Sequence, residues 1–241
     1  MGLTLPCQKN MSLELIVFDL AGTTVKDNHD VHRALQNALA KYGVLISLDD
    51  ANTVMGIPKP VAIRTLLNTC DTFHGPITED VVQEIHHTFV EEMIHFYQDD
   101  PSVGEKDGVS DTFRRLKERK LKVAIDTGFD RQITNSILQR LGWVQNNLID
   151  VSVTSDEVPR GRPYPDLIFK AMELTHVSDS KCVAKVGDTT SDLLEGSSAG
   201  CGWVIGVTTG AYARSELQRE KHTHLIENVR EVLEIFSLNV D

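Results

Sequence analysis

Four polar segments of the chain contain residue types that together could transfer a phosphoryl group. The residues are Asp19, Thr127, Gly128, Arg162, Asp188 and Asp192. A carboxylate such as that of Asp19 can attack phosphorus, and a hydroxyl beside free backbone N–H groups can hold phosphoryl oxygens. A guanidinium can grip a phosphate through two parallel hydrogen bonds. Two carboxylates four residues apart, as at Asp188 and Asp192, suit a hard divalent cation. In this order, the groups predict a phosphoryl-transfer site.

The elements that must position these residues alternate between buried strands and helices. Continuous apolar runs, typical of strands buried on both faces, occupy residues 15–18, 123–125, 151–153, 183–186 and 204–207. Helical spacing of apolar residues is found in residues 110–120, 130–141, 165–174, 191–199 and 228–236. The alternation predicts an α/β fold, a Rossmann-like parallel sheet with helices on both faces. The polar segments follow the strands, at the edge where such sheets bind ligands.

One long region breaks this alternation. Residues 28–103 contain no strand-like run, only helical patterns over 32–42, 60–68 and 79–97 with Gly or Gly-Pro turn signals between them. We therefore expect an inserted helical module over 28–103, and an α/β core made of residues 1–27 and 104–241. The apolar pattern over 225–236 is expected to be the last element that closes the core.

Composition excludes several classes of partner. The 241 residues carry a formal net charge of −11, which argues against a broad nucleic-acid-binding surface but not against one small anionic substrate. No run approaches the roughly 20 apolar residues of a membrane span, and the first residues do not resemble a signal peptide. The scattered cysteines lack metal-site spacing and are expected to be reduced thiols of a cytoplasmic protein. They are Cys7, Cys70, Cys182 and Cys201.

The four segments, which span residues 14–210, resemble the motifs of the haloacid dehalogenase superfamily, and the helical module is similar to that family's mobile cap. Phosphatases of the superfamily usually carry a second Asp where this chain has Ala21, and a Lys where it has Arg162. Both differences, together with the segment Gly-Arg-Pro-Tyr-Pro around Arg162, resemble the phosphonoacetaldehyde hydrolase (phosphonatase) branch. That branch also has a lysine in a Met-Gly-x-x-Lys segment of the cap, which Lys59 matches.

The resemblance implies a role for each residue. The nucleophile that forms an aspartyl-phosphate would be Asp19, and the lysine that forms an imine would be Lys59. Mg²⁺ would be held by Asp19, Asp188 and the backbone carbonyl of Ala21, with Asp192 supporting it. The phosphoryl oxygens would be bound by Thr127, Gly128 and Arg162. Members of the branch often pair through their caps, so a homodimer is a possible arrangement.

Ala21 and Lys59 belong to one chemical argument. A phosphate ester leaves as an alkoxide that needs a general acid, and Ala21 cannot supply the proton, a loss typically of about 10²–10⁴-fold in rate. A phosphonate leaves as carbon and needs an electron sink instead, which a protonated imine on Lys59 would provide. An ordinary lysine, with a pKa of about 10.4, is almost entirely charged near pH 7. Burial and nearby cations are therefore expected to lower the pKa of Lys59.

Departures from the branch keep alternatives open. Ala62 stands where the branch has a His and Phe129 where it has a Tyr, both near the expected carbon part of the substrate. The first hypothesis is a hydrolase of a small 2-oxo-phosphonate such as phosphonoacetaldehyde. The second is a phosphatase for a small phosphate ester, and the third is a low-turnover protein that binds a phosphorylated metabolite. The alternative for Lys59 is a solvated loop lysine.

Several other residues invite a functional interpretation but are expected to be structural. Adjacent helical residues point in different directions, so His86 and His87 are expected on a solvated or partly packed face rather than at a metal. The remaining candidates, expected to be packing residues, are His32, Trp143 and Trp203.

Overall fold

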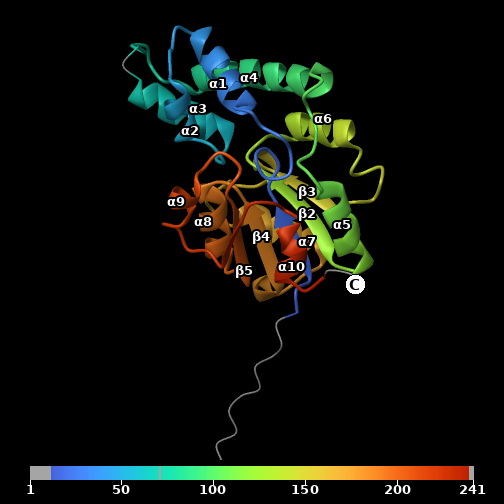
Figure 1. The fold of residues 1–241 in the computed structure, drawn as a ribbon. Coiled ribbons are helices and arrows are strands. Elements are labelled where there is room, and N and C mark those ends of the chain that lie inside the picture. The colour runs from blue at the N-terminus through green and yellow to red at the C-terminus, as the bar shows by residue number, and fades with distance from the viewer. Residues whose placement is uncertain (1–11, 71, 239–241) are drawn as a thin grey trace, which may run out of the picture.

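The computed structural model describes residues 12–70 and 72–238 and contains one parallel six-stranded sheet (Figure 1). In spatial order the strands are β3 (Val151–Thr154), β2 (Lys122–Thr127), β1 (Leu15–Phe18), β4 (Val183–Gly187), β5 (Trp203–Val207) and β6 (His224–Ile226). The predicted α/β fold with a parallel sheet is confirmed. The chain order reverses at β1, which lies between β2 and β4, and a crevice beyond the strand ends is expected at such a point.

Helices cover both faces of the sheet because the strand residues are apolar on both sides. Ile16 and Phe18 of β1 belong to a hydrophobic cluster on one face, whereas Leu15 and Val17 belong to the cluster on the other. In the part of the chain from residue 104 onward, the helices are α5 (Val109–Glu118), α6 (Arg131–Leu141), α7 (Asp166–Thr175), α8 (Thr190–Ala199), α9 (Arg214–Leu217) and α10 (Glu231–Ile235). Two 3₁₀ turns are η1 (Ser155–Glu157) and η2 (Ser180–Cys182). This two-sided burial explains the continuous apolar runs.

Four helices lie between β1 and α5 in the chain and stand together beyond the sheet (Figure 1). They are α1 (Asp30–Ala40), α2 (Leu48–Asn52), α3 (Lys59–Thr69) and α4 (Glu79–Asp99), and we call them the helical insert. The two connections to the sheet run side by side: the Lys26 N–H donates to the Gly104 carbonyl, and the Lys106 N–H to the Thr24 carbonyl. The domain boundaries at residues 28 and 103 stay a prediction.

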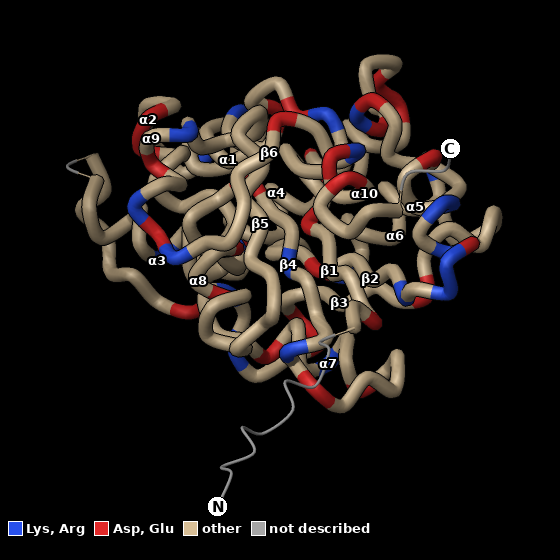
Figure 2. Tube along the Cα trace, turned by 60° about the horizontal axis from the view of Figure 1, so that its bottom comes forward, with Lys and Arg blue, Asp and Glu red and all other residues tan. Residues whose placement is uncertain are grey.

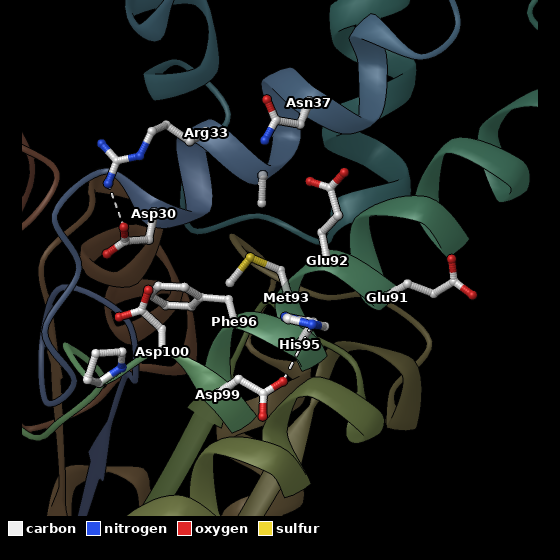
Figure 3. A pocket seen from close by; sticks show the side chains of 12 residues that line it. Asp30, Arg33, Asn37, Glu91, Glu92, Met93, His95, Phe96, Asp99 and Asp100 are labelled. Carbon is white, nitrogen blue, oxygen red and sulfur yellow. Dashed lines mark hydrogen bonds and ion pairs between the residues drawn. The ribbon is translucent and has the colours of Figure 1, made fainter.

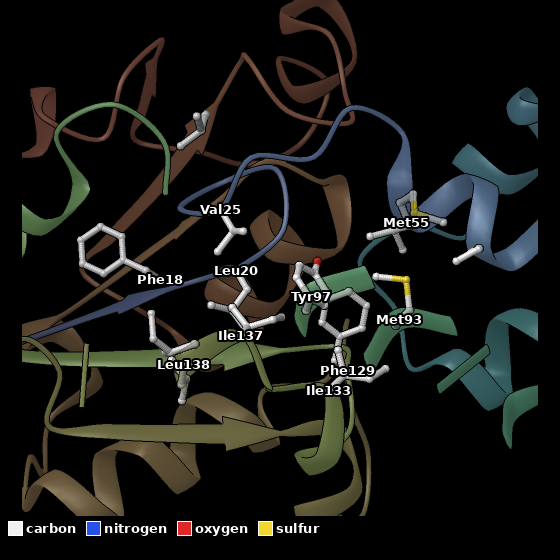
Figure 4. Close-up of a cluster of buried hydrophobic side chains, with 14 of the residues drawn as sticks. Phe18, Leu20, Val25, Met55, Met93, Tyr97, Phe129, Ile133, Ile137 and Leu138 are labelled. Carbon is white, nitrogen blue, oxygen red and sulfur yellow. The ribbon is translucent and has the colours of Figure 1, made fainter. Parts of the chain in front are cut away.

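The helical insert shares a hydrophobic core with the α/β part. Tyr97 and Met93 of α4 lie beside Phe129 and Ile133 from the segment that leads into α6 and from α6 itself (Figure 4). The Phe129 ring centroid is 6.2 Å from that of Tyr97 and 6.4 Å from that of Phe89. The insert is therefore seated on the strand ends by apolar contacts, which position whatever polar groups it carries there.

The sequence analysis mispredicted or missed several short elements. The apolar pattern over 225–236 is two elements, the strand β6 and the helix α10, and α10 is shorter than the predicted helix over 228–236. The helices α2 and α9 were not predicted. These elements have three to five residues, too few to show a period of their own, and only their packing identifies them.

The surface agrees with the composition. Acidic and basic residues are interspersed along the described chain (Figure 2), and the 241 residues together carry the net charge of −11. Across residues 12–70 and 72–238, none of the helices combines the length and the apolar character that a membrane span requires. Cys70 and Cys201 are thiols outside any disulfide, and Cys7 lies outside the described residues.

The core predicts a stability difference between two phenylalanines. Phe113 of α5 is fully buried, with ring centroids 5.0 Å from Phe18 and 5.1 Å from Trp143. Phe113→Ala should lower the free energy of unfolding by about 3–5 kcal/mol because it leaves a cavity. Phe169→Ala, at a half-exposed position of α7, should change it by no more than about 0.5 kcal/mol. Urea unfolding followed by circular dichroism measures both, and equal losses would contradict this description of the core.

Candidate active site

A small cavity lies where the strand ends meet the helical insert. Its volume is about 30 Å³. The lining residues are Asp19, Ala21, Asp27, Val31, Met55, Gly56, Lys59, Thr127, Gly128, Phe129, Arg162, Asp188, Thr189 and Ala211. All the residues that were predicted for the site line it except Asp192. Segments far apart in the sequence thus converge at the carboxyl edge of the sheet, as the strand order requires.

A buried salt bridge joins the predicted nucleophile to the predicted phosphate-binding residue. Asp19 directly follows β1, and its Oδ1 accepts a hydrogen bond of 2.7 Å from Nη1 of Arg162. The exposed fractions are 5% for Asp19 and 3% for Arg162. Burial raises the pKa of Asp19 to about 6, although the guanidinium acts in the opposite direction. If Asp19 attacks a phosphoryl group, the guanidinium lies beside the phosphoryl oxygens and can balance their negative charge.

Asp188 is held rigidly at the end of β4. Its Oδ1 accepts a hydrogen bond of 2.7 Å from the Thr23 hydroxyl, and its Oδ2 accepts one of 2.6 Å from the Ala211 N–H. Close packing accompanies these bonds: a Cβ added at Gly22 or Gly210 would lie 2.3 or 2.0 Å from Oδ2 of Asp188. Burial, followed by the charge of Asp19, raises the pKa of Asp188 to about 8.

The pair of Asp19 and Asp188 fits a divalent metal. The pKa values of both buried carboxyl groups are raised. A bound cation would favour the ionised form of each carboxyl group. Ala21 lines the same cavity as both carboxyl groups. Oxygen ligands of this kind suit Mg²⁺.

Asp192 does not line the cavity. Its Oδ2 accepts hydrogen bonds from the Thr189 N–H at 3.1 Å and from the Thr189 hydroxyl at 2.6 Å, which caps α8. Its Oδ1 lies 3.0 Å from Nη1 of Arg162. Oδ1 makes ion pairs but has no hydrogen-bond partner within residues 12–70 and 72–238. The support of a metal by Asp192 stays a prediction. A possible metal-binding group is formed by three carboxylate oxygens that lie within 4.8 Å of one another, one each from Asp19, Asp126 and Asp192. The cations beside these oxygens are the side chains of Arg162 and Lys185.

Three charged residues of this region were missed in the sequence. Lys185 of β4, Asp126 of β2 and Glu195 of α8 are all fully buried and surround Arg162. Lys185 stands inside the run 183–186 that was treated as a purely apolar strand. A lysine in a strand buried on both faces requires buried acidic partners, and that signal could have identified the cluster.

Lys59 is buried at the start of α3, with an exposed fraction of 4%. Its Nζ lies 5.4 Å from the ring centroid of Phe129 and 5.9 Å from that of Phe89. Burial lowers the pKa of Lys59 to about 8, and the charge of Arg162 contributes to the decrease. The expected direction of this shift is confirmed, and the alternative of a solvated loop lysine is wrong.

Glycines allow the loop before Lys59 to approach the strand ends. A Cβ at Gly128 would lie 2.9 Å from the Ile57 carbonyl oxygen, and one at Gly161 would lie 2.3 Å from Cγ of Pro58. Thr127 is buried, and its hydroxyl accepts a hydrogen bond of 3.2 Å from the Phe129 N–H. The loop of the helical insert therefore covers the turn that contains Thr127 and Gly128.

The residues that were expected to be structural do occupy packed or solvated positions. His87 is 74% exposed, and His86 points instead toward Asp130, with 3.7 Å between Nε2 and Oδ2. His32 is buried, Trp143 donates a hydrogen bond of 3.0 Å to Glu105, and the Trp203 ring centroid is 5.1 Å from that of Phe236.

A larger cavity of about 860 Å³ lies on the outer side of the helical insert, between α1 and α4 (Figure 3). Carboxylates such as Glu92 and Asp99 surround an apolar floor that includes Met93 and Phe96. None of the predicted site residues lines this cavity, so the chemistry is assigned to the smaller one.

Comparison with known proteins agrees with this geometry. The sequence model of the haloacid dehalogenase-like hydrolases matches residues 16–207. This chain belongs to that family. It is 32% identical to a phosphonoacetaldehyde hydrolase of Bacillus cereus (strain B4264) over 237 residues, which cover 93% of this chain and 87% of the relative. The Bacillus mycoides (strain KBAB4) phosphonoacetaldehyde hydrolase is also 32% identical, over 238 residues.

Solved structures show the same haloacid dehalogenase-like fold. A phosphonoacetaldehyde hydrolase-like protein from Oleispira antarctica has a TM-score of 0.82 at 20% identity and covers 93% of this chain and 91% of its own. A predicted phosphoglycolate phosphatase from Haemophilus somnus has a TM-score of 0.77 at 21% identity, with coverage of 92% and 97%. These structures show the fold, and the family model and the relatives in sequence identify the protein as a phosphonatase-like hydrolase of the haloacid dehalogenase family.

The packing around Asp188 predicts how a substitution would change the affinity of this site for Mg²⁺. Gly210→Ala should displace the Asp188 carboxylate and weaken Mg²⁺ binding roughly 10- to 100-fold, the usual effect of disturbing a group that orients a metal ligand. Gly104→Ala is the matched control, because a Cβ there meets nothing within 4 Å. Calorimetric titration with Mg²⁺ measures both, and equal affinities would show that Asp188 does not depend on this packing.

Proposed function

We propose that this hydrolase uses Mg²⁺ to cleave the carbon–phosphorus bond of a small 2-oxo-phosphonate such as phosphonoacetaldehyde. The observation that carries the proposal is a buried lysine in the same small cavity as Asp19 and Arg162. A phosphatase needs no amine at this place. The similarity to phosphonoacetaldehyde hydrolases over most of the chain supports the same conclusion.

The first steps use Lys59. Its neutral amine attacks the substrate's carbonyl carbon, water leaves, and a protonated imine forms. With a pKa of about 8, about a tenth of the amine is neutral at pH 7, far more than for an ordinary lysine. The positively charged imine can then accept the electron pair of a breaking bond, as nucleophilic catalysis by lysine requires.

Asp19 then acts on phosphorus. Its carboxylate attacks, the C–P bond breaks, and the electron pair passes through carbon to the imine nitrogen, leaving an enamine and an aspartyl-phosphate. Protonation of the enamine carbon and addition of water release the aldehyde and restore Lys59. A second water hydrolyses the aspartyl-phosphate to inorganic phosphate. Arg162 binds the phosphoryl oxygens throughout, and Thr127 and the Gly128 N–H complete the cradle.

Mg²⁺ would be held by Asp19, Asp188 and the backbone of Ala21, and when bound it supplies positive charge against the phosphonate. Ala21 has no proton to donate to an ester oxygen, whereas a carbon leaving group needs none from this position. The missing acid therefore disfavours rapid ester hydrolysis and leaves C–P cleavage unaffected.

The size of the cavity limits the substrate. Ligand pockets for drug-sized molecules are about 300–1,000 Å³, and this cavity is about 30 Å³. Its carbon end is lined by the apolar side chains of Val31, Met55 and Phe129. The substrate is accordingly a molecule of few carbons, and the helical insert acts as a cap that opens to admit it.

Reductive trapping tests the imine. Borohydride added with phosphonoacetaldehyde should leave a stable adduct on Lys59 that mass spectrometry locates. Lys59→Met should give no adduct and lose C–P cleavage by about 10³-fold or more, because the electron sink is removed. Lys41→Met is the control, since Lys41 pairs with Glu92 on the surface of the insert.

Two results would contradict the proposal. One is full turnover of the phosphonate by Lys59→Met. The other is robust release of phosphate from small esters without cleavage of the phosphonate, which would select the phosphatase hypothesis.

The pKa of Lys59 predicts a pH profile. Because the imine requires the neutral amine, kcat/KM for the phosphonate should fall below pH 8 as the ammonium form predominates, and level off above it. The measurement uses saturating Mg²⁺ so that the carboxylates stay ionised. A profile that is flat across pH 8 would show that no amine of this pKa takes part.

A further inference from the structure

Two buried cations contact the same three carboxylate oxygens beside the site. Nζ of Lys185 lies 3.1 Å from Oδ1 of Asp192 and 3.0 Å from Oε2 of Glu195, and it also contacts Oδ1 of Asp126. Arg162 reaches these oxygens from another direction. Its Nη1 lies 3.0 Å from Oδ1 of Asp192, its Nε donates to Oε2 of Glu195 at 3.0 Å, and its Nη2 donates to Oδ1 of Asp126.

The arrangement is inaccessible to water. Lys185 and the three acidic side chains are fully buried, and Arg162 has an exposed fraction of 3%. Charges in such a place are tolerated only when they are paired and hydrogen-bonded. Nζ of Lys185 donates a hydrogen bond to Oδ1 of Asp126, whereas Oδ1 of Asp192 has no hydrogen-bond partner among the described residues and contacts the ammonium as an ion pair. Together with its ion pair to Glu195, these contacts link side chains from β2 and α8 through Lys185.

These oxygens determine where the guanidinium points. Arg162 lies in a loop, and its Nε and both Nη atoms contact the acidic residues, while Nη1 also donates to Asp19 at 2.7 Å. Without the ammonium, the three carboxylates would repel one another and share a single cation. The guanidinium would then be drawn away from Asp19 toward them.

We propose that Lys185 is a positioning residue for the phosphate-binding arginine: it holds the three carboxylates that aim Arg162 at the nucleophile. The proposal rests on the proposed function only in that Arg162 binds the phosphoryl group. Lys185 itself does not line the cavity and touches neither the substrate nor the reacting atoms.

Binding of inorganic phosphate tests this role, since phosphate is the product of either phosphonate or ester hydrolysis. Calorimetry in the presence of Mg²⁺ should show phosphate binding to Lys185→Met roughly 10- to 100-fold more weakly than to the wild type, as expected when a binding group is misplaced by about 1 Å. For the substrate that the wild type turns over, kcat should fall with kcat/KM. Lys122→Met is the control, because Lys122 lies half-exposed at the start of β2 beside Asp150.

A second variant covers the case in which Lys185→Met alone does not fold. Lys185→Met with Asp126→Asn removes one cation and one carboxylate together, so the buried charge balance is unchanged. Asp126→Asn alone is its control, because Asp126 also contacts Arg162 directly. The double variant should fold and bind phosphate more weakly than this control. A purely structural lysine would change the unfolding midpoint but not the phosphate affinity of the folded protein.

Each outcome decides the proposal. Wild-type phosphate affinity in folded Lys185→Met would overturn it, as would a folded double variant that binds phosphate as tightly as Asp126→Asn. Failure of both to fold would also overturn it, because Lys185 would then serve the fold rather than Arg162. A wild type that binds phosphate but cleaves no phosphonate would reject the proposed substrate and leave the Lys185 test intact. A wild type that binds no phosphate would overturn both.

Discussion

The salt bridge between Arg162 and Asp19 is almost completely shielded from water, and much of the surrounding structure serves to make that possible. A buried charge costs several kcal/mol unless other charges and hydrogen bonds compensate it. Here the compensation comes from side chains on β2, β4 and α8, which surround the guanidinium on the side away from the cavity. The sheet is therefore both the scaffold of the site and the source of its internal charges.

The helical insert also shields the site from water. Its aromatic contacts with Phe129 close the cavity, and the glycines at 128 and 161 let its loop come within van der Waals distance of the strand ends. Closure removes Lys59 from water, and desolvation is what lowers the pKa of its ammonium. A hydrophobic contact between two parts of the fold thus lowers the pKa of a buried amine, as the proposed imine chemistry requires.

Much of the site could be predicted because its residues follow recognisable strands. Asp19 and Asp188 directly follow continuous apolar runs, and parallel strands bring their carboxyl ends to one edge. Asp192 shows the limit of this reasoning. Its spacing from Asp188 predicts support of a shared metal, which stays a prediction, but the spacing does not show that one oxygen caps α8 at Thr189 and the other pairs with the buried cations. The strand β6 and the helix α2 were missed because such short elements carry no periodicity.

The sequence by itself determined the alternation of strands and helices, the candidate site residues and the edge of the sheet at which they meet. These follow from local patterns and from the geometry of parallel sheets. The tertiary structure alone decided which groups pair. Lys185 was overlooked inside an apolar run, and only packing placed Asp126, Asp192 and Glu195 around it. For Lys59 the sequence offered both a buried amine and a solvated loop lysine, and the packing of the helical insert decided for the buried one, with a lowered pKa. Pairing and burial depend on distances between separate elements, which no local pattern contains.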